Sequence, residues 1–166
     1  MKDTLSVINS LESEKIIDKY AIGDAIGVLF YAEPTYTEDL DIFCYIPKPE
    51  GSLLTDLGPL YEYLEKKGYK PEGGHIRIEG VLVQFLEPGT ELMKEALDSA
   101  DERDYSGTPT RVFQYEHLLA IMAETGRAKD KSRINQVLES KEPDQEKLNE
   151  ILKRHDILDK WAKIVT

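Results

Sequence analysis

Asp39 and Asp41 are acidic residues separated by one position at the head of an apolar segment. Side chains of a β-strand alternate between its faces, so in a strand both carboxylates point to one face with Cα atoms about 7 Å apart. On a buried strand they repel each other, and one takes up a proton unless a cation lies between them. A hard divalent ion such as Mg²⁺ removes the repulsion and prefers oxygen ligands. The pair therefore predicts a magnesium site; the alternative is that one aspartate caps a turn and the other is exposed at the strand end.

The segments that must position this pair are a mixture of strands and helices. Apolar runs and alternation indicate strands, and apolar residues at three- and four-residue steps indicate helices. Glu79-Gly80 is typical of a hairpin turn, and Pro59 favours a helix start because proline suits a first turn. For the front half these patterns predict helices at 4–19, 24–31, 54–67 and 91–100, strands at 20–22, 40–46 and 110–113, and a hairpin over 75–86.

The last third of the chain is predicted to be entirely helical. Helices are expected at 115–124, 128–140, 143–154 and 157–165, with breaks at Gly126 and at Glu142-Pro143. The predicted class is α/β (α+β), with a sheet of three to five strands followed by an all-helical tail. We expect residues 1–113 to form the α/β core. Residues 114–166 should pack on it as one unit, because so short a run of helices buries little apolar surface alone.

Two segments resemble a known superfamily. Ile22-Gly23, followed by Thr37 and by Asp39-Leu40-Asp41-Ile42, is similar to the signature of DNA polymerase β-type nucleotidyltransferases: an apolar residue, Gly, Gly or Ser, a spacer, then Asp-x-Asp between apolar residues. Downstream, residues 115–121 and 126–130 resemble the helical segment of the branch that includes AbiEii-type abortive-infection toxins, among the minimal nucleotidyltransferases. The resemblance implies a nucleotidyltransferase-like mixed sheet flanked by helices.

The resemblance also implies a reaction. In that superfamily carboxylates hold two Mg²⁺ ions, which orient the triphosphate of an NTP and activate an acceptor hydroxyl for in-line attack on the α-phosphorus. Asp39 and Asp41 would be the catalytic metal ligands. A glycine turn at a helix N-terminus would present backbone N–H groups to the phosphates. The residues that this reading assigns to nucleotide binding are Gly23, Asp24, Thr37, Arg127 and Lys129.

Three positions depart from the family pattern. Asp24 stands where a small residue is expected; it suits a helix N-cap but places a negative charge where the triphosphate would lie. Gln84 stands where a third carboxylate is expected, as a neutral and poorer metal ligand, while Glu87 has the opposite parity and would face away. Met122 lies near a position where related toxins often carry Lys. These departures favour the alternative of a catalytically eroded protein.

The densest positive cluster lies near the start of the helix predicted at 128–140, in an acidic chain of net charge −11. It consists of Arg127, Lys129, Lys131 and Arg133. It is either a solvated helix face or a patch that holds NTP phosphates or an RNA acceptor. Because the net charge opposes non-specific binding to polyanions, only such local clustering would let this chain hold one, and neither duplex DNA nor a membrane surface is expected as a partner.

Other polar residues have plainer interpretations. If Glu79-Gly80 is a two-residue turn, His75 lies across from Gln84 on one sheet face with Arg77, as a polar wall of the site or as the polar face of a surface hairpin. His117 is expected in the core. The single cysteine, Cys44, is expected to be buried and needs no oxidising compartment, so the cytoplasm is the default location. The N-terminal residues lack the apolar region of a signal peptide.

Three functional hypotheses follow. The first is a Mg²⁺-dependent nucleotidyltransferase that moves a nucleoside monophosphate from an NTP to an RNA or protein hydroxyl. The second is a catalytically degenerate module that binds a nucleotide or a protein. The third is a toxin paired with an antitoxin, which shares the first chemistry and differs in its target, with tRNA as one candidate.

Overall fold

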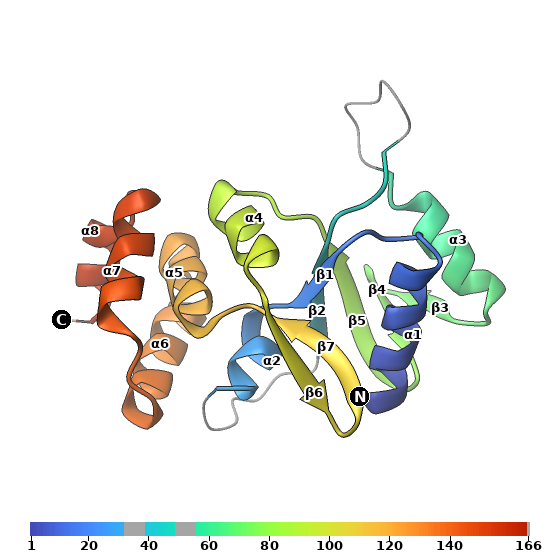
Figure 1. Cartoon of the computed structure of the whole chain (residues 1–166), viewed down its shortest axis with the longest axis horizontal. Helices are drawn as coiled ribbons and strands as arrows, with labels where there is room; N and C mark the ends of the chain where they lie inside the picture. Colours follow the sequence, from blue (N-terminus) through green and yellow to red (C-terminus); the bar gives the residue numbers. More distant parts are fainter. Residues whose placement is uncertain (32–38, 49–55, 166) are drawn as a thin grey trace.

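The computed structural model describes residues 1–31, 39–48 and 56–165, and within them seven strands form one mixed sheet (Figure 1). The order of strands across the sheet is β3-β4-β5-β2-β1-β7-β6. Their bounds are Tyr20–Ile22 for β1, Asp39–Cys44 for β2, Lys70–Glu72 for β3, His75–Ile78 for β4, Val81–Leu86 for β5, Asp101–Tyr105 for β6 and Thr108–Val112 for β7. The predicted class is confirmed, but the predicted count of three to five strands is too low.

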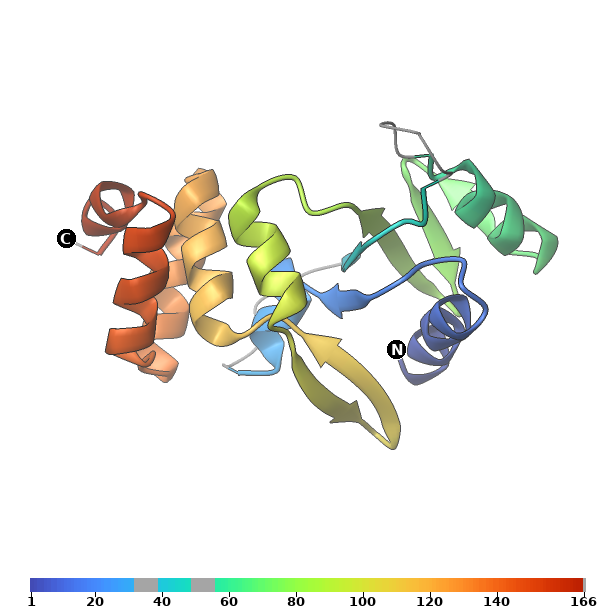
Figure 2. The same ribbon diagram turned by 45° about the horizontal axis from the view of Figure 1, so that its top comes forward.

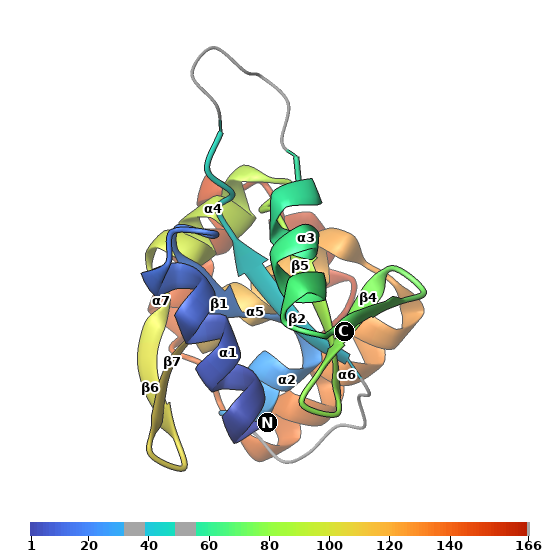
Figure 3. The ribbon, with the colours of Figure 1, turned by 90° about the vertical axis from the view of Figure 1, so that its right-hand side faces the viewer.

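Helices cover both faces of the sheet. They are α1 Lys2–Ser13, α2 Asp24–Leu29, α3 Gly58–Lys66, α4 Glu91–Asp98, α5 Tyr115–Thr125, α6 Ala128–Ser140, α7 Gln145–Arg154 and α8 Leu158–Ala162. Helices α1 and α3 lie together in front of the sheet in Figure 3. The last four helices stack at the opposite end of the molecule, and α4 lies between them and the sheet (Figure 2). Among the described residues, no helix is both long and apolar enough to cross a membrane.

Strand β2 separates two hydrophobic cores. It lies in the middle of the sheet, antiparallel to β1 and parallel to β5. Leu40, Ile42 and Cys44 are buried in the core under α1 and α3, as the alternation predicts. Phe43 belongs to the second core, which is built with α4 to α7. The acidic pair of β2 therefore shares the face that the later helices cover.

The same second core joins the two parts of the chain. Ala21 and Phe43 of the sheet pack in one cluster with Leu118 of α5 and Leu152 of α7. Trp161 packs against this cluster from α8, as its helical spacing predicts. The division of the chain near residue 113 stays a prediction, because this core runs across it.

Strands β3 and β6 were not predicted from the sequence, because their side chains bury little apolar surface and so show no apolar alternation. Strand β3 is wholly exposed, and β6 consists of the exposed polar run Asp101–Tyr105. Both lie at sheet edges, where polar side chains are the rule. The sequence does contain one indication of β6, the Ser-Gly pair at 106–107. In the structure these two residues join β6 to β7 with positive φ values of 52° and 84°, as in a tight hairpin turn.

Most predicted helix positions are confirmed, but their ends differ. The helix predicted at 4–19 ends at Ser13, because Lys15 adopts a left-handed φ of 61° and the N–H of Ile16 bonds to the carbonyl oxygen of Leu11. This is the usual hydrogen-bond closure of a helix C-terminus. The helix predicted at 157–165 spans only Leu158–Ala162. Helix α3 begins at Gly58 with Pro59 in its first turn, as predicted.

Glu95 of α4 binds three side chains of the C-terminal helical part, from α5 and from the end of α7, through its carboxylate. Arg154 donates to it from Nη2 at 2.6 Å and from Nε at 3.0 Å. The Nε2 atoms of His155 and His117 lie 2.7 and 3.1 Å from its oxygens. These bonds, that of Arg154 first, lower the pKa of Glu95 from 4.5 to about 2. His117 is buried, as expected, so this carboxylate ties α4 to the interior of the helical part.

We expect Glu95→Gln to lower the free energy of unfolding by about 1 to 2 kcal/mol at pH 7, a value discounted because the side chain is partly exposed. A carboxylate whose pKa is lowered by folding stabilises the fold above its unfolded pKa. The difference between wild type and variant should therefore shrink as the pH falls from about 4.5 toward about 2. Urea denaturation at pH 7 and pH 3 measures it. Glu91→Gln, which removes one exposed pair with Lys94, is the matched control. An equal loss at both pH values would contradict the prediction.

Candidate functional site

Asp24 and Asp41, from two different elements, lie close together where β1 turns into α2 beside β2. Asp39 and Asp41 stand on β2, and Asp24 is the first residue of α2. The carboxyl groups of Asp24 and Asp41 are within hydrogen-bonding reach of each other. Figure 3 shows α2 next to the lower ends of β1 and β2. The structure thus brings a third carboxylate to the predicted pair.

Burial, together with the neighbouring carboxylates, raises the pKa of Asp41 from 3.8 to about 7. Burial is the largest cause, followed by the charge of Asp24, the hydrogen bond with Asp24 and the charge of Asp39; His75 opposes the shift. The repulsion that the sequence predicted between the two carboxylates of this strand face contributes to the shift, but less than burial and Asp24 do. At neutral pH, Asp41 therefore carries its charge only part of the time in this arrangement.

Arg133 of α6 pairs with Asp24, a contact that the sequence did not reveal. Its Nη1 atom donates to Oδ1 of Asp24 at 3.0 Å, and the two side chains are only 12% and 24% exposed. The two residues are 109 positions apart. Arg133 was visible only as one member of the basic cluster, and no spacing rule singles it out.

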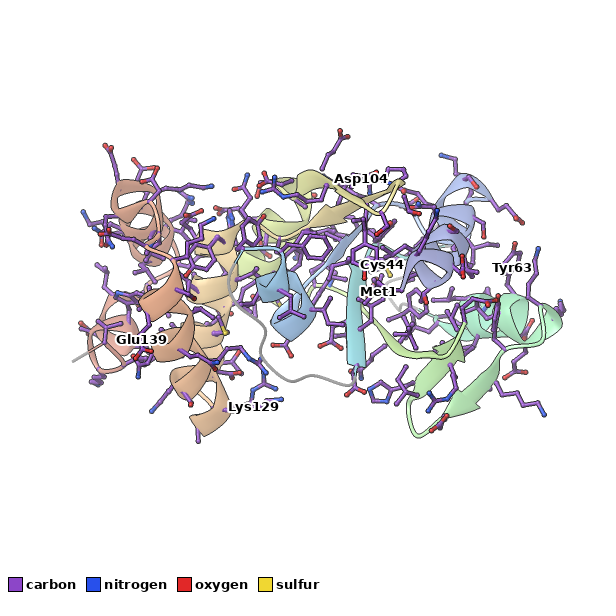
Figure 4. The ribbon with its side chains drawn as sticks, turned by 90° about the horizontal axis from the view of Figure 1, so that it is seen from below. Met1, Cys44, Tyr63, Asp104, Lys129 and Glu139 are labelled. Carbon is purple, nitrogen blue, oxygen red and sulfur yellow. The ribbon has the colours of Figure 1, made fainter. Side chains whose placement is uncertain are left out.

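Arg127 and Lys129, the two cations predicted from the sequence to bind nucleotide, differ in their position relative to the cavity. Arg127 lines the cavity described below and donates from Nε at 2.6 Å to Asp130, which is fully buried. That bond, together with the nearby charges of Asp24 and Asp41, raises the pKa of Arg127. Lys129 is exposed near the start of α6, at the periphery in Figure 4, and does not line the cavity.

A cavity of about 340 Å³ opens beside the aspartates. Its polar edge is formed by Asp24, Asp41, Gln84, Glu87, Thr125 and Arg127. Its apolar wall comes from β2, β5, α4, α5 and the end of β7, through Phe43, Leu86, Met93, Phe113, Leu118, Ile121 and Met122. Glu87 follows the end of β5 at Leu86, and its charge also acts on Cys44 of the opposite sheet face, so the expectation that it faces away stays a prediction.

A larger groove of about 730 Å³ lies elsewhere, between α1 and the β6–β7 hairpin. Its central charges already neutralise each other, since Arg111 donates to both carboxylate oxygens of Glu12 at 2.7 Å. It lacks the feature that distinguishes the smaller cavity, a set of carboxylates that repel one another. The smaller cavity is therefore the candidate functional site.

The sequence of this chain matches a known family along nearly its whole length. Residues 1–159 match the family described as "Nucleotidyl transferase of unknown function (DUF2204)". The chain belongs to this nucleotidyl transferase family. No curated protein matches the chain. The resemblance to the nucleotidyltransferase superfamily is therefore confirmed, while the likeness to the AbiEii branch stays a prediction.

Solved structures support the fold of this nucleotidyl transferase family member. An antigenic nucleotidyltransferase-like protein from Paracoccidioides brasiliensis is 17% identical, with a TM-score of 0.55 over 96% of this chain and 92% of its own. ANT(2'')-Ia in complex with adenylyl-2''-tobramycin is 14% identical, with a TM-score of 0.51 over 92% of this chain and 96% of its own. The solution structure of ANT(2'')-Ia, an antibiotic-resistance factor, has a TM-score of 0.50 at 14% identity, over 99% and 96% of the two chains. At these identities the likeness concerns the fold alone.

Gly23, the glycine of the family turn, has a packing role in the structure. Its N–H donates to the carbonyl oxygen of Asp41 at 3.1 Å, so this amide is already used between β1 and β2. A Cβ atom at this position would lie 2.5 Å from Phe43 and 3.1 Å from Phe113. The glycine is thus required for the close approach of two aromatic rings. Thr37, which the resemblance also assigns to nucleotide binding, lies outside the described residues.

The register places Gln84 and His75 next to the acidic pair. Asp41 pairs with Gln84 across β2 and β5, so the residue expected at a third-carboxylate position is indeed beside Asp41. The β4–β5 register, with Ile76 opposite Val83, continues to His75, whose Nε2 lies 3.7 Å from Oδ2 of Asp39. Arg77, by contrast, binds Glu72 at the sheet edge.

The donor atoms at this site suit a hard divalent cation. Across the described ranges, no three His, Cys, Asp or Glu side chains converge closely enough to hold a metal ion as they stand. Asp24 is drawn to Arg133, and Asp39 has His75 beside it. The chemistry of the donor set nevertheless fits, because carboxylate and amide oxygens are the ligands that Mg²⁺ prefers.

Proposed function

We propose that this protein transfers a nucleoside monophosphate from an NTP to a hydroxyl group of an RNA or protein acceptor. Membership of a nucleotidyl transferase family supports the reaction class. The observation that carries the proposal is the position of Asp39 and Asp41 on the central strand, with Asp41 and Arg127 lining the same cavity. Carboxylates and a cation facing one cavity suit a polyphosphate bound with a divalent metal ion.

In this proposal Asp39 and Asp41, with Gln84 beside them, hold a divalent cation such as Mg²⁺. The ion, when bound, neutralises negative charge on the phosphates and on the attacking oxygen. Arg127 binds phosphate oxygens from the cavity edge, where its side chain is half exposed. The nucleotide-binding set that the superfamily resemblance assigns is completed by the turn at Gly23 and Asp24, by Thr37 of the T-x-D-x-D motif and by Lys129.

The cavity wall contributes the apolar contacts. Phe43, Phe113 and Met93 offer flat and polarisable surfaces near Asp41, which suit a nucleobase or another planar group. We place the reaction in the cytoplasm. An antitoxin protein and tRNA are the partners to test first, as regulator and acceptor respectively.

A label-transfer assay tests the proposal. The purified protein is incubated with each α-labelled NTP, with Mg²⁺ or Mn²⁺, and with bulk tRNA or no added acceptor. Label should move to tRNA or to the protein itself with release of pyrophosphate, and a γ-labelled NTP should give none. If no label moves but an NTP with Mg²⁺ raises the melting temperature, the chain is a nucleotide-binding module. If neither happens, the site does not bind NTP and the proposal is wrong.

The two cations of the basic cluster should contribute unequally to nucleotide affinity. We expect Arg127→Gln to weaken NTP binding by about tenfold, the effect of one charge-assisted hydrogen bond, and Lys129→Gln to weaken it less. Arg127→Lys should restore part of the loss. Isothermal titration with an NTP and with its nucleoside measures both.

The nucleoside separates a phosphate contact from a structural effect. Arg127→Gln also leaves the buried carboxylate of Asp130 without this partner, so all titrations are made well below the melting temperature. A phosphate contact weakens the NTP and spares the nucleoside. Equal losses for both ligands, or a larger loss in Lys129→Gln, would contradict the assignment. Lys153→Gln on α7 is the control for a change of charge alone.

A further inference from the structure

Asp130 is a carboxylate without exposed surface on the first turn of α6. The other buried residues of this helix, Ile134 and Val137, are apolar. The start of a helix favours negative charge, but an exposed aspartate would serve that purpose equally well. Burial of an ionised carboxylate is costly unless an opposite charge and hydrogen bonds replace the lost water. What Asp130 contributes to the protein therefore depends on its partner.

That partner is Arg127, which binds Asp130 at two points. Arg127 donates from Nε to Oδ2 at 2.6 Å and from Nη2 to Oδ1 at 3.1 Å. Two parallel hydrogen bonds between a guanidinium and a carboxylate fix the plane of the guanidinium as well as its position. The side chain of Arg127 is 50% exposed, whereas that of Asp130 is 0% exposed. The guanidinium is thus anchored to the interior on one side and open on the other.

The open side of the guanidinium still carries hydrogen-bond donors. Asp130 uses the N–H of Nε and one N–H of Nη2, so it leaves both N–H groups of Nη1 and the second one of Nη2. Arg127 lines the cavity together with Asp24 and Asp41. Phosphate oxygens accept the same parallel pairs of N–H bonds as carboxylate oxygens do. The edge formed by Nη1 and Nη2 therefore suits a phosphate group at the cavity.

Asp24 and Asp41 are competing partners for this guanidinium. Both lie close enough for their charges to act on Arg127. A long side chain without a fixed partner has the conformational freedom to move toward such charges. Its N–H groups would then bind carboxylates in place of phosphates. The two-point bond to Asp130 opposes this movement, because it holds the guanidinium from the opposite edge.

We propose that Asp130 is a positioning residue for nucleotide binding, which holds the guanidinium of Arg127 at the cavity edge with its Nη1 side open to the phosphates of an NTP. The inference rests on the proposed function above and adds a residue that does not itself line the cavity. Asp130 acts through Arg127 and does not contact the ligand. In a purely structural role, by contrast, the pair would only stabilise the start of α6.

The sign of a change in NTP affinity tests the positioning role. Asp130→Asn removes a negative charge near the phosphates, so charge alone would tighten NTP binding. Loss of positioning has the opposite effect, and we expect binding to weaken by about three- to tenfold, at most the loss expected for Arg127→Gln. Binding of the matching nucleoside should stay unchanged. Isothermal titration with Mg²⁺ and each of ATP, GTP, CTP and UTP measures the affinities, and the NTP that wild type binds most tightly is used for the variants.

A double-mutant cycle tests whether Asp130 acts through Arg127. In the Arg127→Gln background, adding Asp130→Asn should change NTP affinity by less than about twofold. Asp130→Asn keeps the size of the side chain and buries no charge, so it should fold, and the smaller Asp130→Ser is a second variant with the same expected loss. Glu139→Gln, an exposed change on the same helix, controls for the loss of one negative charge and should bind the NTP like wild type.

The outcomes separate this inference from the proposed function. If wild type binds an NTP and transfers label while Asp130→Asn or Asp130→Ser binds that NTP as tightly or more tightly, only the inference is overturned. An equal loss for the nucleoside, or a loss that persists in the Arg127→Gln background, also overturns it, because both indicate a structural role. If wild type binds none of the NTPs and transfers no label, the proposed function falls and the inference with it.

Discussion

Asp41→Asn is expected to abolish nucleotide transfer and to stabilise the fold at the same time. Removing one charge that a divalent cation requires should lower the transfer rate at least about a hundredfold, the effect of losing one electrostatic contact to a transition state. The stabilisation arises because the wild-type carboxylate is buried against Asp24 and beside Asp39, which raises its pKa to about 7. Asparagine has the same size, carries no charge and can donate a hydrogen bond to Asp24.

The sign of the stability change depends on pH. A carboxylate whose pKa is raised by folding stabilises the fold while protonated, and that contribution is lost as the pH rises from about 3.8 to about 7. Asp41→Asn should therefore match wild type near pH 4. At pH 8 it should exceed wild type by about 1 to 3 kcal/mol, a range that allows for coupling with Asp24.

Denaturant melts at pH 4 and pH 8 measure this difference, with Asp159→Asn as the control on an exposed helix. Addition of Mg²⁺ and an NTP should stabilise wild type and not Asp41→Asn, because a ligand stabilises only the protein that binds it. The prediction fails if Asp41→Asn is less stable than wild type at pH 8. It also fails if the variant retains transfer activity, since the aspartate would then hold no essential cation.

Gly23→Ala is expected to lower the free energy of unfolding by about 2 to 4 kcal/mol. Overpacking of a core usually costs about 1 to 3 kcal/mol, so this loss lies at the upper end of that range or above it. The new Cβ atom would lie 2.5 Å from Cε2 and 2.6 Å from Cδ2 of Phe43. The ring cannot simply move aside, since its centroid is 5.0 Å from that of Phe113 in a buried pair. The backbone of β1 and the turn that leads to Asp24 must shift instead.

Thermal and urea denaturation measure this loss. Gly89→Ala is the matched control, because it lines the same cavity and no atom lies within 4 Å of its added Cβ. Adding Phe43→Leu to Gly23→Ala should recover part of the stability, and a double-mutant cycle gives the coupling. A Gly23→Ala variant within about 0.5 kcal/mol of wild type would show that the rings yield easily.

The elements that surround the site were predictable because each has a local pattern. The apolar alternation of β2 placed Leu40 and Cys44 on one face and the acidic pair on the other. The Glu79-Gly80 turn fixed the β4–β5 register and hence brought Gln84 to the centre of the sheet. Strands β3 and β6 were missed because exposed polar edges carry no such alternation.

The site itself was predictable only in part. The positions of Asp39, Asp41 and Gln84 in the sheet were predictable, because strand parity and hairpin register are short-range properties, whereas their roles stay predictions. Arg133 was not singled out, since its contact with Asp24 depends on how α6 packs against α2, across most of the chain.

The amino-acid sequence by itself determined the fold class, the pair of aspartates on a buried strand and the likeness to nucleotidyltransferases, because periodicity, turns and short motifs are local in the chain. The tertiary structure alone decided that Asp24 joins the pair, that Arg133 holds it, and that the apolar wall of the cavity comes largely from later helices. Such contacts arise from the packing of distant elements around a shared core, and local residue patterns do not encode them.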